Sequence, residues 1–262
     1  MPSRWHSSSR DTARPVRSVR YGIVSLRPSP RRPFSTRRWS WTFPNPPAGG
    51  SPTPSPLPHP LARAVVLEMH GHIRIGRWLP FQAIQLQVPP DGYLWVARAG
   101  RGPVSSRGYD SYADGTGQMR WRLLGRVPLV NAAGPDLDRS AAGRVALDAF
   151  TVPTSWLTRS VTWHAGADAD TAVAEWCFGG HTLRPEIRVG ADGTLRSVTM
   201  PRWASPHGEP WGEYACGGIL EGEASFGGIT MPTRMRAGYF FGTERWGEGE
   251  FFRATITDAH FL

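Results

Sequence analysis

Lysine is missing from this chain, so all 30 of its basic residues are arginine. Such a replacement, alongside abundant alanine, glycine and proline, is typical of a GC-rich genome and does not by itself indicate a binding code. Cysteine is scarce too. Cys177 and Cys216 are too few to form a disulfide scaffold in 262 residues. We expect two small, partly buried thiols, while a single bridge between them stays open.

Long apolar runs are also absent from the sequence. No segment approaches the roughly 18–20 apolar residues of a membrane helix, and no apolar h-region follows the N-terminal arginines. The sequence therefore predicts neither a transmembrane segment nor a secretory signal, which leaves the cytoplasm as the default expectation.

Acidic residues are almost missing from the first quarter of the chain. Residues 1–63 hold 11 arginines and one acid, Asp11, for a net charge of +10, whereas residues 64–262 hold 19 arginines and 20 acids, for a net charge of −1. The high isoelectric point thus describes the N-terminal segment. Because a nucleic-acid-binding domain needs a basic face to neutralise phosphates, we expect no nucleic acid on the folded part.

The N-terminal segment, residues 1–62, is rich in arginine, serine and proline, and it lacks the apolar area that offsets the entropy of folding. We predict a disordered tail that precedes a single domain over residues 63–262. Three interpretations of the tail compete: an arm for nucleic acid or an anionic membrane, a cleaved transit-like segment, or sequence translated upstream of the true start, outside the native protein.

The stretch from Tyr109 to Val130 shows the pattern that the rest of the domain repeats. After a turn at 114–117, an apolar row alternates with a polar row: Met119, Trp121 and Leu123 against Gln118, Arg120 and Arg122. A period of two is typical of a half-buried strand.

We predict strands at 65–75, 78–88, 93–97, 118–125, 161–164, 171–178, 181–189, 195–200, 214–226, 229–241 and 250–256. Turn signals at 89–92 and at Asp192-Gly193 favour hairpins, and a loop is expected over 203–212. A helix is predicted over 141–150, capped by Asp138 or Ser140, with a second short helix near 154–157. The fold class is mainly β (α+β): one strongly curved, half-barrel-like antiparallel sheet of about ten strands with one or two covering helices.

The chain has more bulky aromatic residues than a small core needs. Their number favours an apolar concave face that holds a lipid-like or apolar ligand. A core filled by the same rings is the structural alternative. We take the candidate ligand-binding residues from the Tyr109–Val130 stretch and its neighbouring strand: Trp95, Asp110, Met119, Arg120, Trp121 and Arg122. The two arginines of this set, or Arg253, are expected at the mouth, where they would meet a carboxylate or phosphate headgroup. The expected activity is non-enzymatic binding or carriage.

Two other classes of function stay open. An enzyme would use Asp110, His70 and His72, although the sequence lacks a Gly-x-Ser-x-Gly nucleophile elbow. The two histidines share a strand face with Glu68 and are weak metal candidates, because Arg74 lies on the same face. A protein-interaction scaffold is the other alternative. No cofactor is expected, since the paired glycines at 217–218 and 227–228 do not precede a helix.

Several motifs resemble an uncharacterised bacterial family that is described only as a domain of unknown function: 76–81 (GRWLPF), 109–112 (YDSY), 117–121 (GQMRW), 139–141 (RSA) and 153–154 (PT). The resemblance covers about residues 62–262 and implies no known activity. The Met-Arg-Trp strand and the Asp192-Gly193 hairpin with its following strand are similar, more loosely, to the lipoprotein-carrier fold. That second resemblance implies a half-barrel plugged by helices that holds acyl chains.

Overall fold

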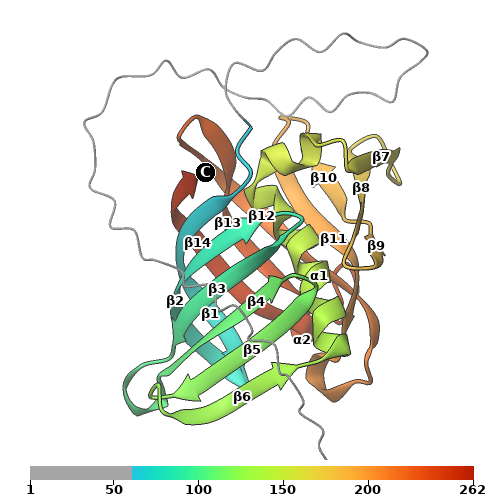
Figure 1. The fold of residues 1–262 in the computed structure, drawn as a ribbon. Coiled ribbons are helices and arrows are strands. Elements are labelled where there is room, and N and C mark those ends of the chain that lie inside the picture. The colour runs from blue at the N-terminus through green and yellow to red at the C-terminus, as the bar shows by residue number, and fades with distance from the viewer. Residues whose placement is uncertain (1–60) are drawn as a thin grey trace, which may run out of the picture. The chain divides into compact units, whose positions relative to one another are not determined.

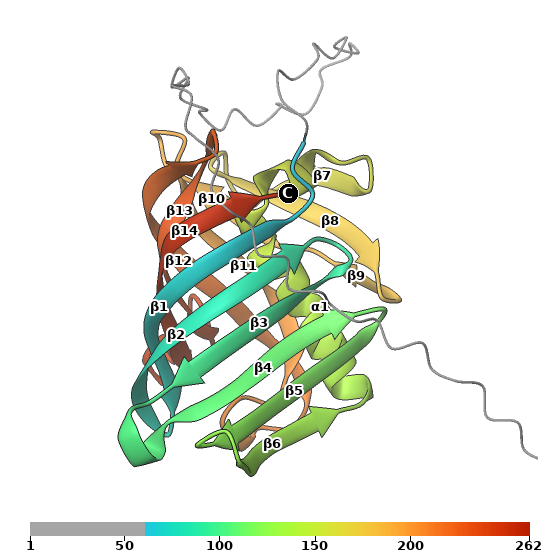
Figure 2. The same cartoon turned by 60° about the vertical axis from the view of Figure 1, so that its left-hand side comes forward.

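The computed structural model describes residues 61–262, and the predictions for the N-terminal tail fall almost wholly outside the described residues. The domain is a 14-stranded sheet in which all neighbouring strands are antiparallel, curved around one main helix (Figures 1 and 2). The predicted class, a strongly curved antiparallel sheet with a covering helix, is confirmed.

The first half of the sheet comprises β1 (Val65–Ile75), β2 (Arg77–Val88), β3 (Gly92–Ala99), β4 (Ser106–Ala113), β5 (Thr116–Leu123) and β6 (Val127–Ala133). After α1 (Pro135–Asp148), the second half comprises β7 (Val161–Ala165), β8 (Thr171–Phe178), β9 (His181–Leu183), β10 (Glu186–Val189), β11 (Leu195–Ala204), β12 (Gly212–Phe226), β13 (Ile229–Tyr239) and β14 (Glu250–Phe261). A single turn, α2 (Trp246–Gly249), precedes β14, and short 3-10 segments lie at Gly102–Val104, Ala149–Thr151, Pro153–Leu157 and Pro206–Gly208.

The described part of the chain starts in the middle of the sheet and returns there. Strands β1 to β6 run outward to one edge, strands β7 to β13 run inward from the other edge, and β14 pairs with β1. Helix α1 is therefore the connection between the two edges, and it packs against β4, β5 and β11 on the inner face (Figure 2). Among residues 61–262 no helix has the length and apolar character of a membrane span.

Some strand boundaries differ from the prediction. The structure has more strands than the expected ten or so, in part because the predicted strand 181–189 is split at Pro185, whose carbonyl still accepts a hydrogen bond from the Ala174 amide at 3.0 Å. The predicted loop over 203–212 is also shorter than expected, since β11 continues to Ala204. The Asp192-Gly193 hairpin between β10 and β11 is confirmed.

Helix α1 begins at Pro135, well before the predicted start. Proline suits the first helical position, and Asp136 and Asp138 in the first turn favour the positive end of the helix dipole. The predicted capping role of Asp138 or Ser140 is wrong, because no described side chain caps this helix. Instead, the Asp138 carboxylate accepts a 2.7 Å hydrogen bond from the Gly117 amide, which ties the helix to β5.

The core lies between α1 and the concave face. Four rings from β2, β3, β5 and β14 pack together there: Phe81 and Trp95 at 5.7 Å between centroids, Trp95 and Trp121 at 5.7 Å, and Phe81 and Phe252 at 5.0 Å. The buried face of α1 consists mostly of small residues, among them Ala141, Ala142 and Ala146. A helix of this composition sits close to the sheet but fills little of the concavity beside it.

Gly71 of β1 lies close against β14, and a Cβ atom there would collide with the backbone carbonyl of Arg253. We expect Gly71→Ala to lower the free energy of unfolding by about 1–3 kcal/mol, because the pairing that joins the two ends of the domain must open. Urea unfolding measures this. Gly247→Ala is the control, because its Cβ would meet no atom within 4 Å. An equal effect of both substitutions would contradict the close approach.

Glu250 is a second anchor of the same region. Its carboxylate, 3% exposed, accepts two hydrogen bonds from Arg236 at 2.7 and 2.9 Å and two from Arg253 at 2.8 and 3.1 Å. Hydrogen bonds from Arg236, and then from Arg253, lower the pKa of Glu250 from 4.5 to about 2. The folded state therefore binds this proton less readily than the unfolded chain does.

Glu250 should stabilise the fold fully above its unfolded pKa of 4.5, and this contribution should fade as the pH falls toward about 2. We expect Glu250→Gln to be destabilising by roughly 2–3 kcal/mol at neutral pH, where two half-exposed guanidinium groups lose their partner. Unfolding curves at pH 7 and at about pH 3 should show the difference between wild type and variant shrinking on acidification. A difference that is constant with pH would exclude the depressed pKa.

Candidate functional site

A cavity of about 280 Å³ is lined by α1 and strands from both halves of the sheet. Its wall is mainly apolar, with contributions from Leu67, Met69 and Ile73 of β1, Trp95 of β3, Met119 of β5, Leu147 of α1, Val198 of β11, Leu220 of β12, Met235 of β13 and Phe252 of β14. Alternation along each strand places these side chains on the concave face. Polar groups are confined to one part of the wall, beside α1.

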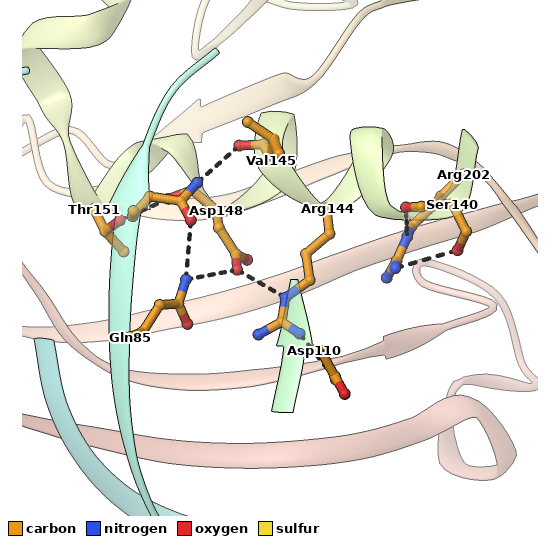
Figure 3. Close-up of polar contacts among 9 residues, drawn as sticks. Gln85, Asp110, Ser140, Arg144, Val145, Asp148, Thr151 and Arg202 are labelled. Carbon is orange, nitrogen blue, oxygen red and sulfur yellow. Dashed lines mark hydrogen bonds and ion pairs between the residues drawn. The ribbon is translucent and has the colours of Figure 1, made fainter. Parts of the chain in front are cut away.

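Arg144 is the centre of that polar part. It projects from α1, donates from Nη1 to Oδ2 of Asp110 at 3.3 Å and from Nε to Oδ2 of Asp148 at 3.1 Å (Figure 3). Its guanidinium carbon also lies 4.5 Å from the ring centroid of Tyr93 and 5.3 Å from that of Trp95. Two carboxylates and two aromatic faces thus compensate a charge whose side chain is only 18% exposed.

The carboxylates that flank Arg144 are themselves held in place. Asp110 on β4 accepts a hydrogen bond from Trp121 Nε1 at 2.9 Å. Asp148 accepts one from Gln85 Nε2 at 3.1 Å, as Figure 3 shows. Gln87 continues the network by donating to the Val145 carbonyl at 3.2 Å. The network joins α1 to β2, β4 and β5, so it fixes the position of the helix on the sheet.

Burial shifts the proton affinities of this network. Burial raises the pKa of the Asp110 carboxyl above its ordinary value, although the Arg144 charge and the Trp121 hydrogen bond act in the opposite direction. Burial also acts to lower the pKa of Arg144, but Tyr93, Asp148 and Asp110 outweigh this effect, and the pKa lies above its ordinary value. Arg144 therefore stays charged.

Arg202 is the second guanidinium of the site and has a different environment. It extends from β11, is half-buried, and donates from Nε to the Ser140 carbonyl at 3.0 Å and from Nη2 to the Ser140 hydroxyl at 3.3 Å (Figure 3). Within residues 61–262 it forms no ion pair with a carboxylate. A second cavity of about 180 Å³ lies beside the first, and Arg144 and Arg202 border both.

Trp95 contributes an unpaired donor to the cavity wall. The side chain is 1% exposed, and its Nε1 atom has no hydrogen-bond partner among the described residues. Leaving such a donor unpaired in an apolar environment costs about 1–3 kcal/mol.

The structure separates the six residues predicted to bind a ligand into three groups. Trp95, Asp110 and Met119 line the cavity. Trp121 is buried behind them, at 6% exposure, and reaches the site through its bond to Asp110. Arg120 and Arg122 are exposed on the opposite face of β5, away from the cavity, and Arg253 is exposed beside Glu250. The guanidinium groups at the cavity are therefore those of Arg144 and Arg202.

His70 and His72 are exposed on the outer face of β1, whereas Asp110 faces α1. The three residues named for the enzyme alternative thus lie on opposite sides of the sheet. No cluster of three or more His, Cys, Asp or Glu residues suited to a metal ion occurs in residues 61–262. Cys177 and Cys216 are both free thiols, the first exposed and the second buried at the cavity wall, where burial raises the pKa of the thiol.

Removal of Arg144 tests whether the buried network holds the helix. We expect Arg144→Met to lower the free energy of unfolding by roughly 3 kcal/mol, because two poorly solvated carboxylates lose their cation. Adding Asp110→Asn to that variant should recover part of the loss. The control is Arg159→Met, an exposed site without an ion pair among the described residues, which should change stability by less than about 0.5 kcal/mol. Strict additivity of Arg144→Met and Asp110→Asn in urea unfolding would contradict the coupling.

Comparison with known proteins places this architecture in a wider context. A domain of a putative outer membrane lipoprotein-sorting protein from Vibrio parahaemolyticus has a TM-score of 0.42 and 9% sequence identity, and the match covers 76% of this chain and 85% of that one. A LolA superfamily protein from Nitrosomonas europaea has a TM-score of 0.43 and 9% identity, with coverage of 77% and 86%. No curated protein matches the sequence.

The sequence itself matches the model of one protein family, which is described as a family of unknown function (DUF6920). The match spans residues 55–261 and includes every motif on which the first resemblance was based. It covers all but the last residue of the described domain. The chain therefore belongs to this family of unknown function.

Proposed function

We propose that the domain is a non-enzymatic binder or carrier of an apolar, lipid-like ligand with an anionic headgroup, such as a fatty acid. The observation that supports this most directly is the combination of an apolar cavity with guanidinium groups at one part of its wall. An apolar tail would occupy the space among Leu67, Met69 and Phe252. The headgroup would lie toward α1, where the arginines are.

The size of the cavity sets limits on the ligand. A dry apolar cavity of about 150 Å³ binds benzene, and typical ligand pockets measure about 300–1,000 Å³. A volume of about 280 Å³ is therefore suited to a short or medium acyl chain, and not to a whole phospholipid. The adjoining 180 Å³ cavity adds space next to both arginines for a headgroup.

Arg202 is the better anchor for the headgroup. The charge of Arg144 is already balanced by two carboxylates, whereas Arg202 bonds neutral oxygens of Ser140 and contacts the side chain of Cys216. A guanidinium has five N–H donors, so these contacts leave donors for an anion.

Displacement of a neutral fluorescent apolar probe from the full chain by decanoic acid and by decanol tests the proposal. Both compounds should compete. We expect Arg202→Gln to weaken binding of the acid by about tenfold, the loss of one charge-assisted hydrogen bond, and to leave the alcohol unchanged within about twofold.

Two further variants serve as controls in this experiment. Arg139→Gln removes a guanidinium of α1 that does not line either cavity, so it should leave both affinities unchanged. Ala237→Leu adds bulk to the cavity wall and should weaken acid and alcohol alike. If neither compound displaces the probe, the proposed function is wrong; if Arg202→Gln weakens both equally, the anchor is misassigned.

A further inference from the structure

The outer face of the sheet carries a row of arginines on three neighbouring strands. Arg98 of β3 lies directly opposite Arg107 of β4, and Arg107 lies directly opposite Arg122 of β5. Arg120 adds a fourth guanidinium to this face, opposite Tyr109. All four arginines are exposed. This face is the reverse of the one that binds α1, so it is separate from the cavity.

These four arginines have no partners among the ion pairs, side-chain hydrogen bonds and ring contacts of residues 61–262. Elsewhere in this domain, Arg188, Arg196, Arg236 and Arg245 each bond a carboxylate. Like charges directly opposite each other on neighbouring strands are destabilising. An anionic partner would relieve the repulsion along the row.

Exposed aliphatic residues continue the same face next to the arginines. Ile84 of β2 and Val96 of β3 are cross-strand partners that are 53% and 49% exposed, and Leu94 is 38% exposed. Tyr109 lies opposite Val96. One carboxylate, Glu68, borders this group opposite Ile84. The face thus joins an aliphatic and aromatic patch to a basic row.

We propose that this outer face of β2–β5 docks on an anionic lipid bilayer. Charge argues against the other occupants that the chain itself supplies: residues 1–63 carry a net charge of +10, and a second copy would bring the same arginine row. A nucleic acid would satisfy the guanidinium groups but would leave Ile84 and Val96 without apolar contacts. Lipid headgroups meet the arginines, and the boundary between headgroups and acyl chains takes aliphatic and tyrosine side chains.

Sedimentation of the full chain with phosphatidylcholine vesicles that contain phosphatidylglycerol, compared with vesicles of phosphatidylcholine alone, tests the docking face. Arg107→Gln/Arg122→Gln should reduce partitioning onto the anionic vesicles by about tenfold, since each arginine near the surface contributes to attraction. The matched control is Arg159→Gln/Arg196→Gln, which removes the same charge from the second half of the sheet and should change partitioning by less than about twofold. The basic N-terminal segment is common to all variants.

Ile84→Thr/Val96→Thr tests the aliphatic part and keeps β-branched residues in the strands. It should weaken partitioning onto anionic vesicles severalfold and leave binding to duplex DNA unchanged. Thermal melts of all variants check folding, and loss of two opposed charges should not lower the midpoint of Arg107→Gln/Arg122→Gln. Equal losses in both arginine double variants would overturn the proposal. It would likewise fail if Arg107→Gln/Arg122→Gln weakened DNA binding as strongly as vesicle binding while Ile84→Thr/Val96→Thr affected neither.

Discussion

The buried charge of Arg144 is the interaction on which the arrangement of helix and sheet depends. Helix α1 offers mostly alanine and glycine to the concave face, so apolar contacts alone specify its position weakly. Arg144 adds directional contacts to Asp110 on β4 and, through Asp148 and Gln85, to β2. A buried ion pair is not more stabilising than a well-packed apolar group, but breaking it is costly. The ion pair thus fixes the position of α1 on the sheet more than it adds net stability. Because the fixed helix carries small residues, it leaves the cavity open.

Local patterns in the sequence predicted the strands well and the site only in part. Alternation assigned the inner and outer faces of β1 and β5, and the turn residues at Asp192-Gly193 located a hairpin, because both signals act over a few residues. One partner of Arg144 is not local in this sense: Asp110 lies 34 positions away, on β4. An arginine in an alanine-rich helix usually faces solvent, so only the folded sheet identifies it as buried.

The alternation of residues in β5 already argues against Arg120 and Arg122 as headgroup ligands in the cavity. The period of two that turns Trp121 inward also turns its two neighbours outward. The structure has them exposed on the outer face, while Arg202, which lies between Pro201 and Trp203, points to α1. The net charge of the domain also did not indicate where charge of one sign gathers on its surface. Residues 64–262 carry a net charge of −1, yet most of their carboxylates are engaged elsewhere, and one stretch of the outer face keeps four unpaired arginines.

The two proposals assign different physical roles to arginine on the two faces of one sheet. On the inner face, desolvation makes each guanidinium costly unless it is bonded, so Arg144 and Arg202 are held by fixed oxygens and remain rigid donors. Because Ser140 and Cys216 do not use all five N–H groups of Arg202, an anion can bond to the others without displacing α1. Ligand binding and helix anchoring are then compatible. On the outer face, water solvates each guanidinium, and the arginines attract a surface without having to be ordered first. Because successive side chains of a strand point to opposite faces, the sheet keeps these two sets of arginines in separate environments.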